Sequence, residues 1–86
     1  MSHFIYQLYY AVDMRDDRKV YLLVRQDADS MQTECALLSY GTLVDAVKSK
    51  ARANPEYYQW EPAGMLKHFL YMPSGLLAEW AIGGAL

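Results

Sequence analysis

The sequence predicts an α+β fold, in which a small N-terminal antiparallel sheet of two to three strands packs against two to three C-terminal helices. Residues 3–26 alternate between apolar and polar side chains, which is typical of strands. Residues 42–86 carry apolar side chains at helical spacing, interrupted by prolines and glycines. With 86 residues and no internal repeat or linker, residues 1–86 are expected to form a single domain.

The first predicted element is a β-hairpin. Residues 3–12 place one fully apolar face on a strand, made of Phe4, Tyr6, Leu8, Tyr10 and Val12. The charged connection over 13–18 contains no glycine, so it fits a loop of about four to six residues better than a tight two-residue turn. Residues 19–26 then alternate again, which completes the hairpin.

Residues 31–40 are compatible with two structures. As a strand, they place Thr33, Cys35 and Leu37 on one face. As a helix, they would end at Gly41, and Met, Gln, Glu, Ala and Leu favour that structure by propensity. A third strand makes a hairpin independently stable, so the strand is the favoured interpretation and the helix remains the alternative.

The first helix is predicted to begin at Thr42. Thr42 to Asp45 has the form of a capping box with Asp in the third position, and Leu43, Ala46 and Val47 would form the buried stripe. Asn54-Pro55 ends this helix, because the residue before a proline disfavours the helical conformation. Residues 56–61, between two prolines, are expected to form an ordered loop or a short extended piece.

Two further helices are predicted near the C-terminus. Pro62 suits the first turn of one, whose apolar stripe would be Met65, Leu66, Phe69 and Leu70. Pro73 ends it, Ser74 caps the last helix, and the Gly83–Gly84 pair terminates that one. The pattern leaves open where residues 73–86 dock.

Composition narrows the possible location and partners. The net charge of −2 does not favour nucleic acid. The single cysteine, Cys35, excludes an internal disulfide framework and fits a reducing compartment. The apolar stretch 69–86 is broken by Pro73 and Gly75 and is too short for a membrane-spanning helix. We therefore expect a cytoplasmic protein, in its own cell or in the cytoplasm of a host, without membrane contact.

No residue pattern indicates catalysis, a cofactor or a metal. Cys35 and His68 lie on separate elements, and no third group that would orient them is evident nearby. The acidic loop around Asp13 also contains Arg15 and Arg18, which would oppose a bound cation. The glycines are isolated and form no phosphate-binding loop. The sequence therefore predicts a protein that is not an enzyme.

The aromatic content instead indicates binding. Eight Tyr and two Trp occur in 86 residues, and such side chains suit surfaces that meet a partner. The predicted anchors are Tyr57, Tyr58 and Trp60, because adjacent aromatics between two prolines cannot all point inward. The other predicted binding residues are Tyr9, Tyr21, Lys48 and Arg52.

The resulting hypothesis is a small non-catalytic protein-binding protein. The 53% hydrophobic composition exceeds what so small an interior hides, which indicates a homodimer or a surface covered by another chain. Small size and this composition are associated with phage or mobile-element inhibitors of host or defence enzymes. One alternative is a module that binds a nucleotide-like small molecule in an aromatic-lined pocket, with Arg25 or Lys48 as the polar anchor. A further alternative is a weak single-stranded nucleic-acid binder.

Overall fold

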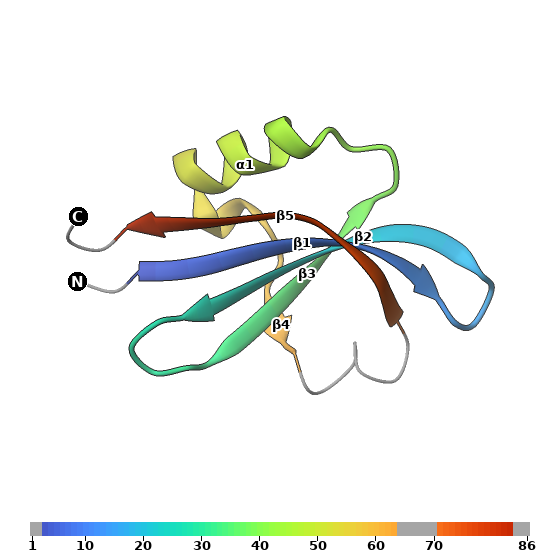
Figure 1. The fold of residues 1–86 in the computed structure, drawn as a ribbon, viewed down its shortest axis with the longest axis horizontal. Helices are drawn as coiled ribbons and strands as arrows, with labels where there is room; N and C mark the ends of the chain where they lie inside the picture. The colour runs from blue at the N-terminus through green and yellow to red at the C-terminus, as the bar shows by residue number, and fades with distance from the viewer. Residues whose placement is uncertain (1–2, 64–70, 84–86) are drawn as a thin grey trace.

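The computed structural model describes residues 3–63 and 71–83, which form one twisted antiparallel sheet with a helix on one face (Figure 1). The strand order is β4-β3-β2-β1-β5. The elements in chain order are β1 (His3–Asp13), β2 (Arg18–Asp27), β3 (Thr33–Ser39), α1 (Val44–Ala53), the 3-10 turn η1 (Pro55–Tyr57), β4 (Glu61–Pro62) and β5 (Tyr71–Gly83).

The predicted N-terminal hairpin is confirmed. β1 pairs with β2 along its length, from Phe4 opposite Asp27 to Asp13 opposite Arg18. The four-residue loop between them closes with a hydrogen bond from the Asp17 amide to the Asp13 carbonyl oxygen at 2.8 Å. The absence of glycine therefore did predict a longer loop.

The strand interpretation of residues 31–40 is also confirmed, because Thr33–Ser39 forms β3 and pairs with β2. The turn before it is held by Asp27, whose carboxylate oxygen Oδ1 accepts the amide of Asp29 at 2.8 Å. Met31 in this turn has a φ of 65°, in the left-handed region. Gly41, with a φ of 97°, turns the chain after β3.

The predicted C-terminal helix over 74–82 is wrong, because Tyr71–Gly83 is the strand β5, paired antiparallel with β1. Leu, Ala and Glu in this segment favour helix locally, but pairing with the second edge of β1 outweighs that preference. The helix predicted before it does not start at Pro62 or reach Pro73, because Pro62 lies in strand β4 and Pro73 in strand β5. Its predicted apolar stripe, 65–70, lies outside the described residues. The fold is therefore a five-stranded sheet with a single α-helix in the described part of the chain, and not a two- to three-stranded sheet against two to three helices.

The helix α1 begins two residues later than predicted. Its N-cap residue is Leu43, which makes no side-chain cap hydrogen bond, while the Thr42 hydroxyl donates to the Ser39 carbonyl oxygen at 2.8 Å. The predicted capping box is therefore absent. Val47 and Ala51 are the buried helix residues, and Leu43, predicted to be internal, is 74% exposed. The predicted stop at Asn54-Pro55 is correct.

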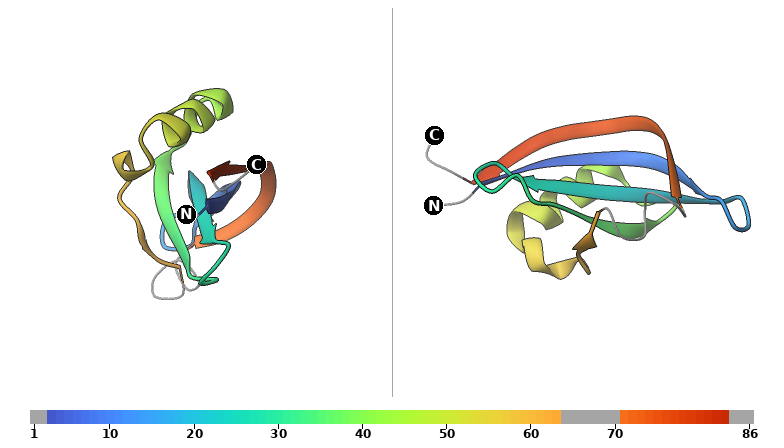
Figure 2. Two further views of the ribbon diagram at one scale, coloured as in Figure 1. Left: turned by 90° about the vertical axis from the view of Figure 1, so that its left-hand side faces the viewer. Right: turned by 90° about the horizontal axis from the view of Figure 1, so that it is seen from below.

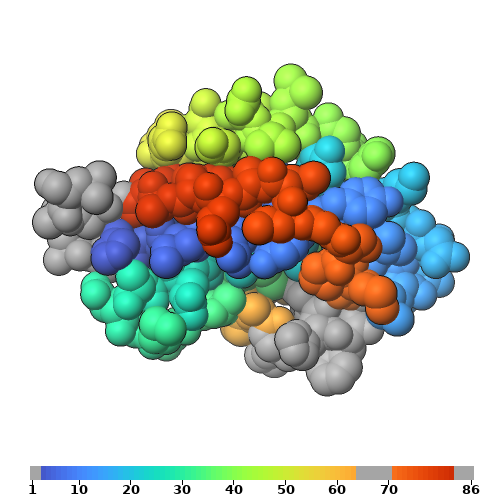
Figure 3. Space-filling view, in the orientation of Figure 1, coloured from blue at the N-terminus to red at the C-terminus, as the bar shows by residue number. Residues whose placement is uncertain are grey.

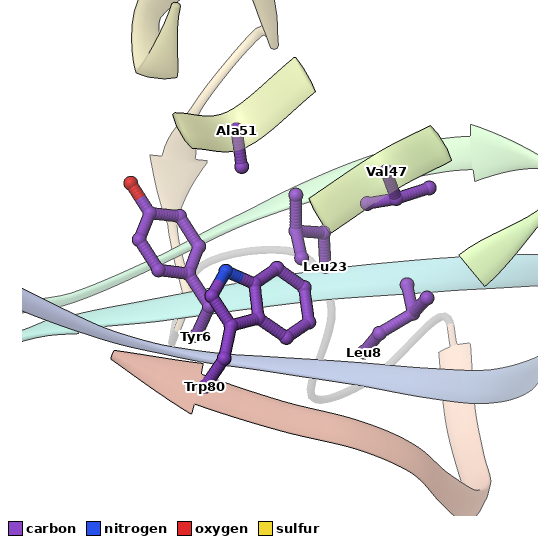
Figure 4. Packing of buried hydrophobic residues seen from close by; sticks show 6 residues of the cluster. All are labelled: Tyr6, Leu8, Leu23, Val47, Ala51 and Trp80. Atoms are coloured by element: carbon purple, nitrogen blue, oxygen red, sulfur yellow. The ribbon is translucent and has the colours of Figure 1, made fainter. Parts of the chain in front are cut away.

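The main core lies between α1 and the sheet (Figure 4). It consists of Tyr6, Leu8, Leu23, Val47, Ala51 and Trp80. The Tyr6 and Trp80 rings stack with centroids 5.5 Å apart. Since Trp80 comes from β5, this stack joins the last strand to the first.

The other face of the sheet carries a second cluster of Ala11, Val20, Leu22, Cys35 and Tyr71. Cys35 is 1% exposed there, so its role is packing rather than surface reactivity. Figure 2 shows the twist of the sheet and the bend along β5. Both faces of the sheet therefore carry an apolar cluster, and α1 covers the one that contains Tyr6 and Trp80.

Candidate protein-interaction surface

Two of the three predicted anchors hold the fold together. The Trp60 indole Nε1 donates to the Pro55 carbonyl oxygen at 2.7 Å, and its ring lies 6.1 Å from that of Tyr6. The Tyr58 hydroxyl donates to the Val47 carbonyl oxygen at 3.4 Å, and burial raises the pKa of Tyr58. Both side chains are half-buried. The segment after α1 is thus attached to the helix and the sheet through these two rings.

Arg25 is also structural. It is 6% exposed, and its guanidinium carbon lies 4.6 Å from the ring centroid of Phe4 and 4.1 Å from that of Trp60. Ion pairs at 2.9 Å to Glu34 and 3.3 Å to Glu56 complete its environment. Burial disfavours its charge, but the hydrogen bonds to these partners outweigh that effect and raise the pKa of Arg25. A residue enclosed in this way is not available to anchor a small molecule.

Tyr57 is the predicted anchor that faces outward. Its side chain is 60% exposed, and the Lys50 ammonium lies 4.5 Å from its ring centroid. Tyr57 borders a hollow of about 260 Å³ between α1 and the end of β3. The hollow, here called the helix-side hollow, is lined by Leu38, Ser39, Thr42, Ala46, Val47, Lys50, Tyr57 and Tyr58.

A second hollow, of about 430 Å³, lies beside the same end of β3. This loop-side hollow is lined by Arg18, Lys19, Val20, Leu37, Leu38, Ser39 and Tyr40. Tyr40 is 54% exposed and contacts the rings of Tyr10 and Tyr21 at 5.9 and 5.5 Å. The Lys19 ammonium lies 5.8 Å from the Tyr40 ring centroid. The two hollows meet at Leu38 and Ser39.

The strand between these hollows is paired on only one side. β4 pairs with β3 at Glu34 and Cys35 only. Among the described residues, 36–39 pair with no strand other than β2. Ala36 is 1% exposed and the Ser39 carbonyl oxygen accepts from Thr42, so the accessible part of this edge is 37–39, without the Ser39 carbonyl. An edge of this kind presents backbone N–H and C=O groups that another strand can pair with. The open edge of β3 therefore lies between two hollows that contain aromatic and cationic side chains.

The remaining predicted site residues are dispersed. Tyr9 lies on the other face of the sheet and donates to Gln7 Oε1 at 3.0 Å. The Lys48 ammonium lies 5.8 Å from the Trp80 ring centroid, and Arg52 is exposed in the last turn of α1. Tyr21 contacts Tyr40 and is half-buried.

The structure thus brings Tyr57 and Tyr58 to the open edge and leaves Tyr9 away from it. The surface residues that sequence reasoning missed are Lys19, Leu38, Ser39, Tyr40 and Lys50. The aromatic Tyr40 directly before the turn glycine is the signal that points to an exposed strand end.

A third hollow, of about 470 Å³, lies on the face opposite α1. It is lined by Gln7, Tyr9, Met14, Leu22, Val24, Ala63, Tyr71, Met72 and Pro73. Beside it, the carboxylate of Asp13 is 1% exposed and pairs with Arg15 at 2.8 Å. Hydrogen bonds from Arg15 lower the pKa of Asp13 to about 2. Arg15 also donates to the Tyr71 hydroxyl at 2.9 Å, which attaches the start of β5 to the first hairpin.

Residues 3–63 and 71–83 contain no group of three or more His, Cys, Asp or Glu side chains arranged to hold a metal ion. No helix in that same part of the chain is long and apolar enough to cross a membrane. No family model, curated protein or solved structure matches the chain.

Proposed function

We propose that this protein is a non-catalytic protein-binding module that accepts an extended segment of another protein along residues 37–39 of β3. The observation that carries the proposal is the open edge of β3 with a hollow on either side. In strand addition of this kind, main-chain hydrogen bonds supply affinity and pockets for alternate side chains supply specificity.

The chemistry of the two hollows defines the partner. Lys19 and Lys50 place a cation near each of the exposed rings, Tyr40 and Tyr57. Aromatic side chains are common binding hot spots, and flanking cations favour a partner of opposite charge. The favoured occupant is therefore an extended peptide that alternates apolar with acidic residues. The expectation that the partner is a host or defence enzyme, blocked by a phage or mobile-element inhibitor, remains a prediction from chain size and composition.

Selection from a random peptide library tests this proposal. Enriched peptides are expected to contain alternating apolar and acidic residues and to shift the amide resonances of 37–39. The variants Tyr57→Ala and Lys50→Glu should each weaken binding, by tenfold or more for a true hot spot of about 2 kcal/mol. Arg52→Glu is the matched control, since Arg52 is exposed on the same helix but lines neither hollow. Peptides that bind all three variants equally, or that shift only other residues, would refute this site.

The third hollow supports a second candidate, a small-molecule site. Its volume of about 470 Å³ lies in the range of ligand pockets, and Gln7, Tyr9 and Tyr71 are lining residues with polar side-chain groups. Neither Arg25 nor Lys48, the anchors expected from sequence, lines it. A thermal-shift screen with uncharged aromatic compounds tests this candidate, because a ligand of the folded state raises the Tm. A compound that raises the Tm of the Tyr9→Ala variant as much as that of the wild type would show that it binds outside this hollow.

A further inference from the structure

The last strand, β5, forms the edge of the sheet opposite β4 and β3. Among the described residues it pairs only with β1, and Figure 3 shows it as an exposed ridge along the long axis of the molecule. Met72, Leu76 and Leu77 are 54%, 53% and 45% exposed. Glu79 is the only charged residue of the strand. A long apolar edge of this kind readily pairs with another strand.

The first half of β5 is unsuited to such pairing, whereas the second half is regular. Pro73 lacks a backbone N–H, and the register with β1 shifts between Tyr10 and Ala11 and between Leu8 and Tyr9. These shifts leave Ser74 and Leu77 as extra residues, as in β-bulges, which bend a strand and interrupt pairing. Residues 78–83 contain no such irregularity.

We propose that β5 pairs antiparallel with β5 of a second copy, so that two sheets join into one continuous sheet across a twofold axis. Antiparallel pairing of identical strands needs an axis perpendicular to the sheet, so each residue meets one that lies on the same face. Centring the axis on Trp80 pairs residues 78–82 of the two copies with one another and leaves only Gly83 opposite the bulged residue Leu77. It places Glu79 opposite Ala81 of the partner subunit and avoids the like-charge pair that centring on Glu79 would create.

A second copy fits this edge better than an unrelated strand. The segment is apolar apart from Glu79, and it pairs with itself without a like-charge pair once Glu79 faces an alanine. The exposed Ile5 lies across from Ala81 on the neighbouring strand, so the surface directly beside the contact is apolar as well. Because β5 and β3 lie towards opposite edges of the sheet, the dimer leaves both open edges of β3 at its outer ends. The inference therefore does not depend on the proposed peptide site.

Charge substitutions at Ala81 test both the contact and its register. Ala81→Glu places a second carboxylate opposite Glu79 of the partner subunit, twice by symmetry, and should weaken dimerisation by roughly tenfold or more. Ala81→Lys should keep or strengthen the dimer, because it forms opposite-charge pairs with the same residues. The double variant Glu79→Lys with Ala81→Glu restores those pairs in reverse and should restore the dimer.

The measurement is solution mass by light scattering or sedimentation across a concentration series, with Tm and circular dichroism to show that each variant folds. Ser49→Glu, at an exposed position of α1 that lines neither hollow of the peptide site, is the charge-matched control and should leave the dimer unchanged. A wild-type monomer at all concentrations would overturn the inference. If Ala81→Glu and Ala81→Lys dimerise to the same extent at each concentration, the proposed pairing of Glu79 with Ala81 is wrong. Peptide binding at β3 should persist in all these variants, so the two proposals fail separately.

Discussion

Replacing Arg25 by methionine tests how the segment after α1 is held to the sheet. Methionine keeps much of the volume but loses the charge, the stacking on Phe4 and Trp60, and the ion pair with Glu34. Desolvated cation–π contacts contribute up to about 2 kcal/mol each, and a hydrogen bond to a charged group about 1.5–3 kcal/mol. The cost of burying the guanidinium offsets part of this sum. We therefore expect Arg25→Met to lower the free energy of unfolding by about 2–3 kcal/mol.

That loss is large for a chain of this size, whose total stability is expected to be about 4–13 kcal/mol. Arg25→Lys keeps the charge but loses the planar stacking, so an intermediate loss of about 1–2 kcal/mol is expected. Urea unfolding followed by Trp fluorescence measures both, because Trp60 and Trp80 lie beside the core. Glu56→Gln is the control, since Glu56 is 75% exposed and should contribute below about 1 kcal/mol. A cost for Arg25→Met within about 0.5 kcal/mol of zero, the usual range for surface substitutions, would refute the reasoning.

Three further substitutions give distinct outcomes. Because the pKa of Asp13 is lowered to about 2 from 3.8, its stabilising effect is complete above the higher value and is lost as the pH falls towards the lower one. In the Asp13→Asn variant, Tm should therefore fall less steeply as the pH is lowered from 3.8 to about 2. The same fall of Tm in the variant and the wild type would contradict a stabilising ion pair of Asp13. The Tyr6 hydroxyl is buried without a hydrogen bond of normal geometry, so Tyr6→Phe should leave stability unchanged or raise it by up to about 1 kcal/mol in urea unfolding. A clear loss would show that the hydroxyl is bonded. Met31→Gly should relieve a left-handed backbone and raise the unfolding free energy by about 0.5–1 kcal/mol, whereas Met31→Ala, the control, should not.

The parts of the fold that follow from sequence are those set by neighbouring residues. Alternation predicted β1 and β2, and the charged glycine-free connection predicted the length of the first loop. The pattern of residues 31–40 fitted both a strand and a helix, and the strand was favoured because it would stabilise the hairpin. Asn54-Pro55 ended α1 where expected, because proline restricts the residue before it whatever the tertiary context. The start of α1 was misplaced, since the burial of Val47 and Ala51 against the sheet decides which turn packs inward.

The candidate sites depended on contacts between distant residues. Tyr57, Tyr58 and Trp60 are close in sequence, yet only Tyr57 is exposed, because the other two rings meet α1 and Arg25. The open edge of β3 exists because β4 is two residues long and pairs only at Glu34 and Cys35. The residue pattern of β3 alone does not indicate how many of its residues pair with β4.

The sequence by itself determined the N-terminal hairpin and the end of α1 at Asn54-Pro55, because these depend on residue type and short-range spacing. Residues 31–40 fitted a strand or a helix, and their pairing with β2 decided for the strand. Only the tertiary structure decided that residues 71–83 form a strand. Their local preference is helical, but β1 presents a second edge with Tyr6 positioned to stack on Trp80. Pairing between residues more than sixty positions apart outweighs a helix preference of less than about 1 kcal/mol per residue.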